Sequence, residues 1–401
     1  MLIVRIMTTV ARSNRYHIAI FGRRNAGKSS LVNCIAGQGV SIVSDVAGTT
    51  TDTVWKNIEL PGVGAAVIAD TAGFDDVGEL GTMRVDAARK VLARADVAIL
   101  LLGEYDGDAS PEKEWLERMR EQQLPVIIVA GKSDKEGSAE HVIAWQSALA
   151  VDVIPFSAVT GEGRDALLDC IARQYTQDDD LDDITHSLVK SGDVVVLVMP
   201  QDASAPKGRL IQPQVQTLRN LLDKHCIPLC CAPEELPNLL QSLVAPPQLI
   251  ITDSQAFATV EKLTPPETKL TSFSVLMARH KGDIDAFRSG AKVLLALPPT
   301  ARVLIAEACS HIPQNEDIGR VKLPRLLRSK LGDGLQIDVV GGNDFPDDLV
   351  GYDIVIHCGA CMFNRRTVLS RVRRAKAQGV PITNYGIAIA ALSGILDRVV
   401  V

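Results

Sequence analysis

The stretch Gly22-Arg23-Arg24-Asn25-Ala26-Gly27-Lys28-Ser29 decides the fold of the first part of the chain. It follows an apolar run at 17–21 that predicts a buried strand, and it opens a stretch at 29–36 that predicts a helix. The pattern G-x-x-x-x-G-K-S between a strand and a helix is typical of a phosphate-binding loop. Its glycines let backbone N–H groups surround the phosphate oxygens, while Lys28 reaches the β and γ phosphates and the Ser29 hydroxyl binds Mg²⁺. We expect the nucleotide to contact Gly22, Asn25, Ala26, Gly27, Lys28, Ser29 and Ser30.

A second phosphate element follows the next predicted strand. The sequence Asp70-Thr71-Ala72-Gly73 comes directly after the apolar run 65–69. Asp70 can hold the Mg²⁺ shell, and the Gly73 N–H can bind the γ-phosphate. Further strand-like runs at 97–102, 126–130 and 153–155 alternate with amphipathic stretches, which predicts a βαβ series from about residue 16 to 175.

Two short motifs in this region indicate guanine as the base. Gly131-Lys132-Ser133-Asp134 resembles the N-K-x-D motif of GTPases, in which the carboxylate accepts both N–H donors of guanine, and Ser157-Ala158 matches the remaining base loop. With these motifs, residues 16–175 resemble the TRAFAC GTPases, specifically the Era/TrmE-like branch. Gly131 stands where that family has Asn, so one side-chain contact with the base region is lost.

The resemblance also implies features of the hydrolysis of GTP to GDP and phosphate. Thr50, in Gly48-Thr49-Thr50-Thr51-Asp52, resembles the switch residue that closes over Mg²⁺. Phe74 stands where Ras-like proteins carry a water-positioning Gln, so we expect slow turnover. In relatives without that Gln, an Asn at the position of Asn25 helps to bind K⁺, although an ordinary loop Asn would look the same. The expected catalytic set is Lys28, Ser29, Thr50, Asp70 and Gly73.

Composition limits the remaining possibilities. A length of 401 residues predicts two to four domains, and 46% apolar with 22% charged residues is typical of globular proteins. The net charge of −6 argues against a nucleic-acid partner, because such binding depends on neutralising phosphates. The N-terminal residues lack the apolar region of a signal peptide and no long apolar run follows, so we expect a cytoplasmic protein without a membrane partner. The eight cysteines are therefore expected to be free thiols or metal ligands.

The order of predicted elements gives an α/β protein of three domains. We expect a P-loop GTPase domain over 1–176, an Asp-rich linker over about 177–184, and two further α/β domains over 185–265 and 266–401. The last boundary is placed at Pro265-Pro266, because consecutive prolines favour an extended connector. Strands are predicted at 193–199, 301–306, 336–340 and 353–357, and helices at 213–226 and 364–378.

Three cysteines follow predicted strands of the last domain. Cys309 comes after 301–306, and Cys358 and Cys361 come after 353–357, so all three can lie at the C-terminal edge of one sheet. A C-x-x-C pair alone is compatible with zinc, redox or iron–sulfur roles. A redox dithiol leaves Cys309 without a role, whereas an iron–sulfur cluster takes three thiolates and can leave a fourth position open. Candidate fourth ligands nearby are His311, His357 and Glu316.

The pattern Cys309-x-His311, 45 residues, then His357-Cys358-x-x-Cys361 resembles the signature of the FeFe-hydrogenase maturation GTPase family, HydF. The resemblance implies a 4Fe–4S cluster on three cysteines with an exchangeable position. It also implies a transient diiron precursor bearing CO and cyanide, for delivery to apo-FeFe-hydrogenase, and the radical-SAM maturases HydE and HydG as partners. The family's middle domain mediates dimerisation, so we expect a homodimer formed through 185–265. The apolar strand 194–199 is suited to that role, although a core strand of the same domain would look identical. Cys226, Cys230 and Cys231 do not match the signature and are interpreted as buried apolar residues.

Two other functions remain open from the sequence. The GTPase half would equally suit an RNA-modification or ribosome-assembly GTPase whose cysteines bind structural zinc. A nucleotide-gated docking switch without a catalytic role would fit the slow turnover expected from Phe74. Metal content separates the cluster protein from the zinc-binding GTPase, since iron with sulfide indicates the former and a single zinc indicates the latter.

Overall fold

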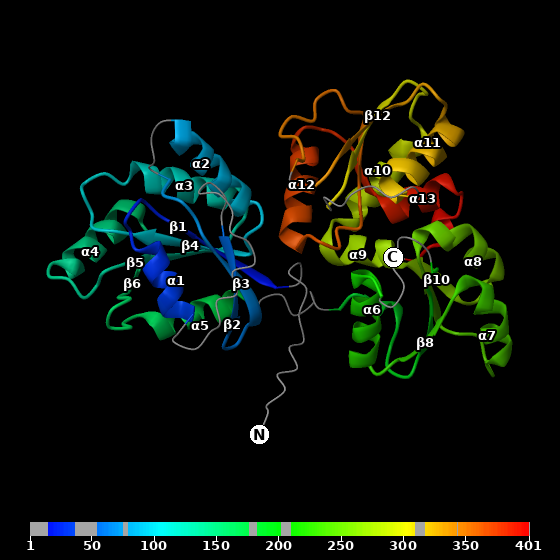
Figure 1. The fold of residues 1–401 in the computed structure, drawn as a ribbon, viewed down its shortest axis with the longest axis horizontal. Helices are drawn as coiled ribbons and strands as arrows, with labels where there is room; N and C mark the ends of the chain where they lie inside the picture. Colours follow the sequence, from blue (N-terminus) through cyan, green and yellow to red (C-terminus); the bar gives the residue numbers. More distant parts are fainter. Residues whose placement is uncertain are drawn as a thin grey trace. The chain divides into compact units, whose positions relative to one another are not determined.

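The structure is a computed structural model that describes residues 15–36, 54–74, 79–175, 183–201, 210–308, 317–342 and 344–400. The chain divides into two compact units, Met1–Asp179 and Asp180–Val401, and each is described here by itself (Figure 1). The division falls within the Asp-rich stretch 177–184, where the sequence predicts a linker. Across the described ranges, no helix combines the length and the apolar character needed to cross a membrane.

The first unit is built on a six-stranded sheet with the order β2-β3-β1-β4-β5-β6. All neighbouring strands are parallel except the edge strand β2, which pairs antiparallel with β3. The central strand β4 is buried along its whole length, as its run of Val, Ala, Ile and Leu predicts. The strands are β1 (Tyr16–Phe21), β2 (Val54–Leu60), β3 (Gly64–Asp70), β4 (Val97–Leu102), β5 (Val126–Ala130) and β6 (Ile154–Pro155).

Helices cover both faces of this sheet (Figure 1). One apolar cluster contains Leu31 of α1 and Ile171 of α5, and the other contains Trp115 of α3 and Trp145 of α4. The helices are α1 (Lys28–Ala36), α2 (Glu79–Leu92), α3 (Ser110–Glu121), α4 (Ser138–Leu149) and α5 (Arg164–Tyr175). This arrangement leaves the C-terminal ends of the parallel strands free for a ligand, as is usual in open α/β sheets.

The second unit contains two four-stranded sheets in which all neighbouring strands are parallel. Their orders are β10-β9-β7-β8 and β12-β11-β13-β14. The strands are β7 (Val194–Val198), β8 (Ile227–Cys231), β9 (Leu249–Thr252), β10 (Lys269–Ser272), β11 (Arg302–Ala306), β12 (Gln336–Val340), β13 (Ile354–His357) and β14 (Ile382–Asn384). The α-helices are α6 (Gln212–Asp223), α7 (Leu236–Ser242), α8 (Phe257–Leu263), α9 (Phe273–Lys281), α10 (Ile284–Leu295), α11 (Leu323–Leu331), α12 (Arg365–Ala377) and α13 (Tyr385–Leu392). A π-helical turn, η6, spans Ile318–Lys322, and 3₁₀ turns span His186–Leu188, Pro233–Glu235, Ser254–Ala256 and Leu396–Arg398.

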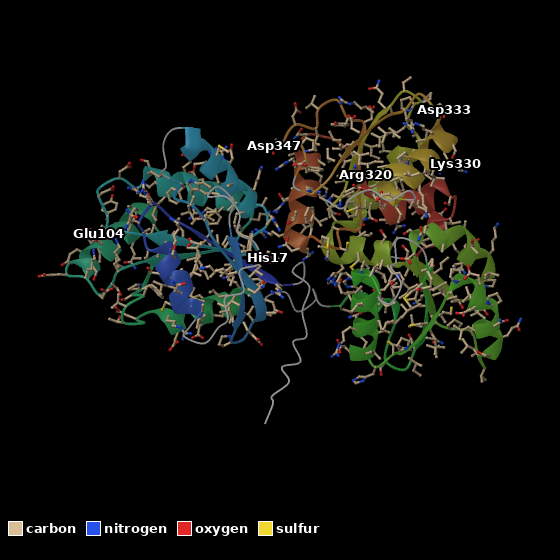
Figure 2. All side chains as sticks on the ribbon, in the orientation of Figure 1. His17, Glu104, Arg320, Lys330, Asp333 and Asp347 are labelled. Atoms are coloured by element: carbon tan, nitrogen blue, oxygen red, sulfur yellow. The ribbon has the colours of Figure 1, made fainter. Side chains whose placement is uncertain are left out.

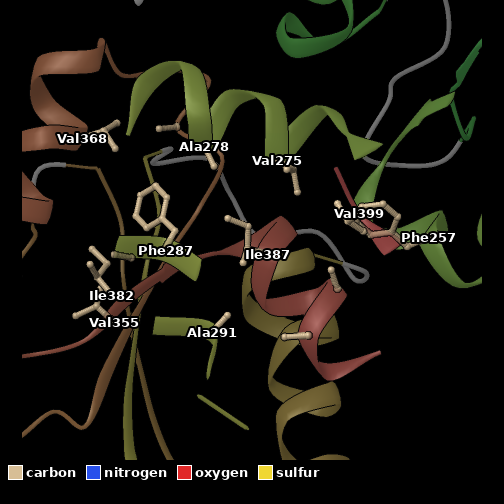
Figure 3. Close-up of a cluster of buried hydrophobic side chains, with 14 of the residues drawn as sticks. Phe257, Val275, Ala278, Phe287, Ala291, Val355, Val368, Ile382, Ile387 and Val399 are labelled. Atoms are coloured by element: carbon tan, nitrogen blue, oxygen red, sulfur yellow. The ribbon is translucent and has the colours of Figure 1, made fainter. Parts of the chain in front are cut away.

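The two sheets of the second unit share one apolar core. A single buried cluster includes Val196 and Ile250 of the first of these sheets and Leu304 and Val355 of the other. Helix α9 links them: Figure 3 shows Val275 and Ala278 of α9 facing the same cluster as Phe287 and Ile387. The expected domains 185–265 and 266–401 therefore fold as one compact unit.

The expected boundary at Pro265-Pro266 needs correction. Strand β10 begins at Lys269 and pairs with β9, so the first sheet of the second unit continues past residue 265. The prolines begin the turn that joins α8 to β10 and do not separate two domains, since the Thr268 N–H donates to the Pro265 carbonyl at 3.1 Å immediately before β10.

Strand β7 is also placed differently from the expectation of a dimer contact at 194–199. It lies between β9 and β8, and Val195, Val196, Leu197 and Val198 are fully buried. It is a core strand. The sheet's edges are β8, where Ile227 is 53% exposed, and β10, where the end of the chain adds a short parallel bridge between Leu270 and Val399.

The three cysteines that were interpreted as buried apolar residues are not alike. Cys226 is buried, but Cys230 is exposed and Cys231 is half-buried on the edge strand β8. The alternation of an edge strand turns Cys230 toward water, which composition alone does not reveal.

Candidate functional site

The phosphate-binding loop brings together the residues that the sequence predicts for it. The Lys28 Nζ donates to the carbonyl oxygens of Gly22 at 3.0 Å and Arg23 at 2.8 Å, and the Ser29 hydroxyl donates to Asp70 Oδ2 at 2.6 Å. Ser29 and Asp70 come from different elements, the start of α1 and the end of β3. Their contact places a hydroxyl and a carboxylate where both can serve one hard cation such as Mg²⁺.

The backbone of this loop explains its glycines. A Cβ at Gly22 would collide with the carbonyl oxygen of Leu101 on β4, so the loop can pass the neighbouring strand only with glycine there. Gly27 has a φ of 102°, and Asn25 is left-handed with a φ of 58°. These turns aim the backbone N–H groups inward at the start of α1.

The loop is also anchored by an ion pair that the sequence analysis did not anticipate. Arg23 donates to Glu112 at 2.6 Å and to Asp106 at 2.6 Å, and the Glu112 side chain is only 2% exposed. The hydrogen bond with Glu112, opposed in part by burial, raises the pKa of Arg23, so the guanidinium stays charged. The pairing spans 89 residues. Because no local pattern joins the two residues, a single sequence offers no signal for it.

The switch elements are only partly visible. Thr50 lies outside the described residues. Thr71 is buried, and its hydroxyl donates to the Ile20 carbonyl at 2.7 Å, which fixes the end of β3 beside β1. Phe74 is 8% exposed and stacks on Trp115 with ring centroids 5.5 Å apart. The position of a water-orienting Gln is thus taken by a side chain packed into the core.

The residues expected to bind the base lie together next to the phosphate loop. The Ser157 hydroxyl donates to Asp134 Oδ1 at 2.6 Å, which holds the carboxylate at the mouth of the base loop. A Cβ at Gly131 would lie 3.2 Å from the Ala26 carbonyl, so this residue touches the phosphate loop directly. A cavity of about 400 Å³ adjoins it, lined by Gly103, Glu104, Gly131, Lys132, Lys135 and His141 among others (Glu104 is labelled in Figure 2). Ala158 follows Ser157 and is half-buried in the same loop.

In the second unit, the ends of β11 and β13 meet at one sheet edge. The strands are direct neighbours, with Ala306 beside His357. Cys358 follows β13 at once, and Cys361 lies three residues on. Cys309, His311 and Glu316 lie outside the described residues, so the structure brings two of the three expected thiol ligands together. Within the described ranges, no group of three or more His, Cys, Asp or Glu side chains is arranged to hold a metal ion.

The surroundings of Cys358 fit a thiolate that binds metal. Its Sγ accepts the Ala308 N–H at 3.0 Å and the Ala360 N–H at 3.4 Å. Burial raises the pKa of this thiol to about 11, while the two N–H groups act in the opposite direction. A metal would have to displace the proton, after which the N–H donors stabilise the sulfur's negative charge. The donor set present therefore suits a soft metal centre.

His357 does not lie where a fourth ligand needs to be, and that expectation is corrected. Its side chain is fully buried, and its Nε2 is 3.1 Å from Arg371 Nη1 while its Nδ1 is 2.9 Å from the Cys358 carbonyl oxygen. Because Arg can only donate, Nε2 accepts and Nδ1–H donates to the carbonyl. Burial, followed by the charge of Arg371, lowers the pKa of His357 to about 3, so the ring is neutral. His357 orients the cysteine loop through its hydrogen bond to the Cys358 carbonyl.

Two buried cations, from helices α12 and α9, contact this loop. Arg371 of α12 is 6% exposed, and its guanidinium lies over the rings of Phe345 and Phe363 at 4.8 and 4.5 Å. Lys281, the last residue of α9, is 3% exposed and donates to the carbonyl oxygens of Ala360 and Phe363. Burial lowers the pKa of Lys281 to about 8, and the thiols of Cys361 and Cys358 act in the opposite direction.

A cavity of about 200 Å³ opens beside Cys361. It is lined mainly by apolar atoms, including those of Phe273 and Met277 on α9, Ile318 on the π-helical turn and Ile389 on α13. Other charged groups near this edge are paired: Arg320 contacts Glu307 at 3.0 Å, and Arg374 contacts Asp347 at 2.8 Å (Arg320 and Asp347 are labelled in Figure 2). The edge thus presents the Cys361 thiol next to a mostly apolar hollow.

Comparison with known proteins separates the two halves of the chain. The first half is 38% identical over 155 residues to the tRNA modification GTPase MnmE of Laribacter hongkongensis, a match that covers 38% of this chain and 33% of the relative. MnmE of Neisseria meningitidis is 36% identical over 161 residues, covering 39% of this chain and 34% of the relative. The chain therefore spans about a third of the length of these curated relatives. A crystal structure of Aquifex aeolicus Era is 20% identical with a TM-score of 0.34, covering 54% of this chain and 92% of that one, and adds nothing to the assignment.

Family models extend over the rest of the chain. Residues 17–132 match a model described as a 50S ribosome-binding GTPase. Residues 184–282 match the hydrogen maturase F dimerization domain, and residues 285–401 match the hydrogen maturase F tetramerization domain. These two matches meet after α9, not at residue 265, and together they cover more than half of the chain. They indicate self-association through both domains, where the sequence predicted a dimer through one. With a P-loop GTPase domain followed by both of these domains, the chain belongs to the hydrogen maturase F family, HydF.

Proposed function

We propose that this protein is a GTP-hydrolysing scaffold that carries a 4Fe–4S cluster and delivers a diiron precursor to apo-FeFe-hydrogenase. The observation that carries the proposal is the position of Cys358 and Cys361 after β13, in a chain of the HydF family. Strand β13 lies beside β11, the strand that precedes Cys309 in the sequence. Cys309, Cys358 and Cys361 would hold the cluster. His311 and Glu316 remain candidates for the fourth position, and His357 supports the loop instead.

The cluster, when bound, supplies an iron with an exchangeable coordination position, at which the CO- and cyanide-bearing precursor is held. The residues of the chain stabilise the cluster ligands and form the surface beside the site. The N–H groups of Ala308 and Ala360 stabilise the Cys358 sulfur, and the hollow beside Cys361 offers mostly apolar surface next to the site. The proposed partners are HydE and HydG, which would supply the precursor, and the apo-hydrogenase, which would receive it.

The GTPase half would act by positioning and charge. Lys28 offsets the negative charge that builds on the β and γ phosphates, and Ser29 with Asp70 and Thr50 would hold Mg²⁺ or its water shell, while Gly73 binds the γ-phosphate. Water attacks the γ-phosphorus, and GDP and phosphate are released. Since Phe74 is packed on Trp115 and cannot orient that water, turnover would be slow. Asn25, exposed and left-handed in the loop, would help to bind K⁺. Turnover would then fall when Na⁺ replaces K⁺, and equal rates in the two salts would reject the K⁺ site.

Metal analysis of anaerobically purified protein tests the scaffold function. We expect iron with acid-labile sulfide, and an EPR signal of a reduced 4Fe–4S cluster after dithionite. Cys309→Ser, Cys358→Ser and Cys361→Ser should each deplete the cluster and abolish hydrogenase activation while GTP hydrolysis continues. Cys230→Ser is the matched control, because Cys230 is exposed on β8 and should retain the cluster.

His311→Ala and Glu316→Gln should retain a cluster with altered spectra, because the fourth position exchanges. Zinc held by four protein ligands, or hydrogenase activation by the triple cysteine variant, would reject the proposal. The zinc result would favour the RNA-modification alternative, whose support among the comparisons is limited to the GTPase half.

A further inference from the structure

Lys281 is a buried amine outside the proposed set of cluster ligands. It ends α9 and is 3% exposed. Its Nζ donates to the Ala360 carbonyl at 3.3 Å and to the Phe363 carbonyl at 2.9 Å, which are the carbonyls on either side of Cys361. Helix α9 belongs to the core shared by the two sheets, so the amine is fixed by an element outside the cysteine loop.

The same peptide segment connects this amine to the sulfur of Cys358. Ala360 has a left-handed φ of 52°, a conformation that non-glycine residues seldom adopt. In this conformation its N–H donates to Cys358 Sγ while its carbonyl accepts from Lys281. Contact with Lys281 therefore favours the loop geometry that provides an N–H···S bond.

The Lys281 ammonium is buried without a carboxylate partner among the described residues. A buried ammonium is costly unless a negative group compensates it. Among the residues that the structure describes, no carboxylate lies within ion-pair distance of its Nζ. The thiols of Cys361 and Cys358 favour its charged form, and the adjacent His280 ring is held neutral by burial. Thiolates at these positions would supply the compensating negative charge.

We propose that Lys281 is a positioning residue for the metal centre, which holds the Cys358–Cys361 loop and offsets the negative charge of the thiolate-bound cluster. This inference rests on the proposed function. A 4Fe–4S core of charge 2+ with three thiolates carries a net charge of 1−, and one electron from an added reductant changes this to 2−. A nearby buried positive charge stabilises the second state more than the first. Lys281 should therefore raise the reduction potential.

The test is an EPR-monitored redox titration of the full-length protein after anaerobic reconstitution. In Lys281→Met the charge is removed with little change in side-chain length, and we expect the one-electron equilibrium constant for reduction to fall at least about ten-fold, or 59 mV. Lys281→Arg keeps the charge and should lie within about three-fold of the wild type. Lys269→Met is the matched control, since Lys269 donates to the Leu188 carbonyl at 3.0 Å but is exposed on β10, and it should leave the potential unchanged.

Thermal melting gives a second readout that needs no electron transfer. Lys281→Met should lower the melting temperature of the cluster-bound protein more than that of the metal-free protein, because the compensating charges are present only in the former. An unchanged or raised potential in Lys281→Met, or equal losses of melting temperature in both forms, would overturn the inference.

Loss of the cluster from Lys281→Met with retention in Lys281→Arg supports the charge role, and loss from both overturns it. Absence of iron and sulfide from the wild-type protein would instead reject the proposed function, so the two failures are distinguishable.

Discussion

The phosphate loop of the first unit and the cysteine loop of the second share one structural feature, a buried lysine that holds the loop backbone. Each follows a parallel strand at the C-terminal edge of a sheet, and each is contacted by a buried lysine that donates to two loop carbonyls: Lys28 in the first, Lys281 in the second. The difference lies in where the lysine comes from. Lys28 is six residues from the farther of its two partners, whereas Lys281 is 82 residues from Phe363. A loop whose lysine belongs to the same short motif can be recognised from sequence. A loop whose lysine comes from a helix distant in the sequence cannot.

The largest expected effect is at Lys28. Lys28→Ala removes the cation that would compensate the β and γ phosphates, and we expect GTP turnover to fall by about 10³-fold, measured as phosphate release under saturating Mg²⁺. Lys281→Met should leave that rate unchanged, because its loop takes no part in phosphate chemistry. The comparison fails if Lys28→Ala keeps a rate within about three-fold of the wild type.

The second effect tests whether the phosphate loop also depends on a distant partner. Glu112→Gln weakens the buried pair with Arg23 and should lower the free energy of unfolding of the first unit by about 3 kcal/mol. Glu114→Gln, on the same helix, breaks only an exposed pair with Arg118 and should cost about 0.5 kcal/mol or less.

Urea unfolding followed by tryptophan fluorescence measures this selectively, since Trp55, Trp115 and Trp145 are the only tryptophans and all lie in the first unit. Equal losses of unfolding free energy in the two variants would show that the phosphate loop does not depend on the pair between Arg23 and Glu112.

A third effect concerns the base loop. Asp134→Asn replaces a charged acceptor by a neutral amide, and GTP should bind about ten-fold to a hundred-fold more weakly, measured with a fluorescent GTP analogue. Glu136→Gln is the control, because this side chain is exposed in the same loop and lies at the adjoining cavity. An unchanged affinity in Asp134→Asn would mean that guanine is read by other groups.

The smallest expected effect is a pH dependence of the stability of the second unit, which comes from His280 next to Lys281. Burial lowers the pKa of His280, the neighbour of Lys281, from 6.5 to about 4, so this ring is neutral in the folded protein and binds protons mainly when unfolded. Stability therefore falls as pH drops below the unfolded pKa, and the loss ends near pH 4, where the folded form also binds a proton.

Between pH 7 and 5.5 the contribution should be about 1 kcal/mol. In His280→Gln the far-UV circular dichroism transition of the second unit should lose that part of its pH slope. A slope identical to the wild type would show that His280 is not buried as a neutral ring.

The sequence predicted most of what depends on neighbours along the chain. The strands at 97–102, 126–130 and 336–340 agree with β4, β5 and β12 to the residue, because a local concentration of apolar and β-branched residues is a signal that a single sequence shows. The meeting of Ser29 with Asp70 also followed from motif order. The base loop and the C-x-x-C loop were likewise placed at the correct strand ends.

What the sequence did not yield depends on tertiary contacts. The antiparallel edge strand β2, the short strands β8, β9, β10 and β14, and the shared core around α9 have no distinctive spacing. His357 looked like a ligand because it precedes Cys358, and only the positions of Arg371 and the Cys358 carbonyl show that both its nitrogens are used. Arg23 with Glu112, and Lys281 with Ala360, join residues tens of positions apart, which a single sequence does not encode as a pattern.

The C-terminal residues have a consequence for how copies of this chain can assemble. The Val400 N–H donates to the Leu270 carbonyl at 2.8 Å, the Thr271 hydroxyl donates to the Val400 carbonyl at 2.7 Å, and Arg398 binds the carbonyls of Pro265 and Thr268. The end of the chain thereby occupies the β10 side of the sheet, while no strand of the described part of the chain covers β8. An unpaired parallel edge such as β8 can add a strand from a second copy, whereas the β10 edge is already contacted by the chain's own C-terminal residues. Removing the last four residues would expose a second unpaired strand and make open-ended stacking into fibres possible.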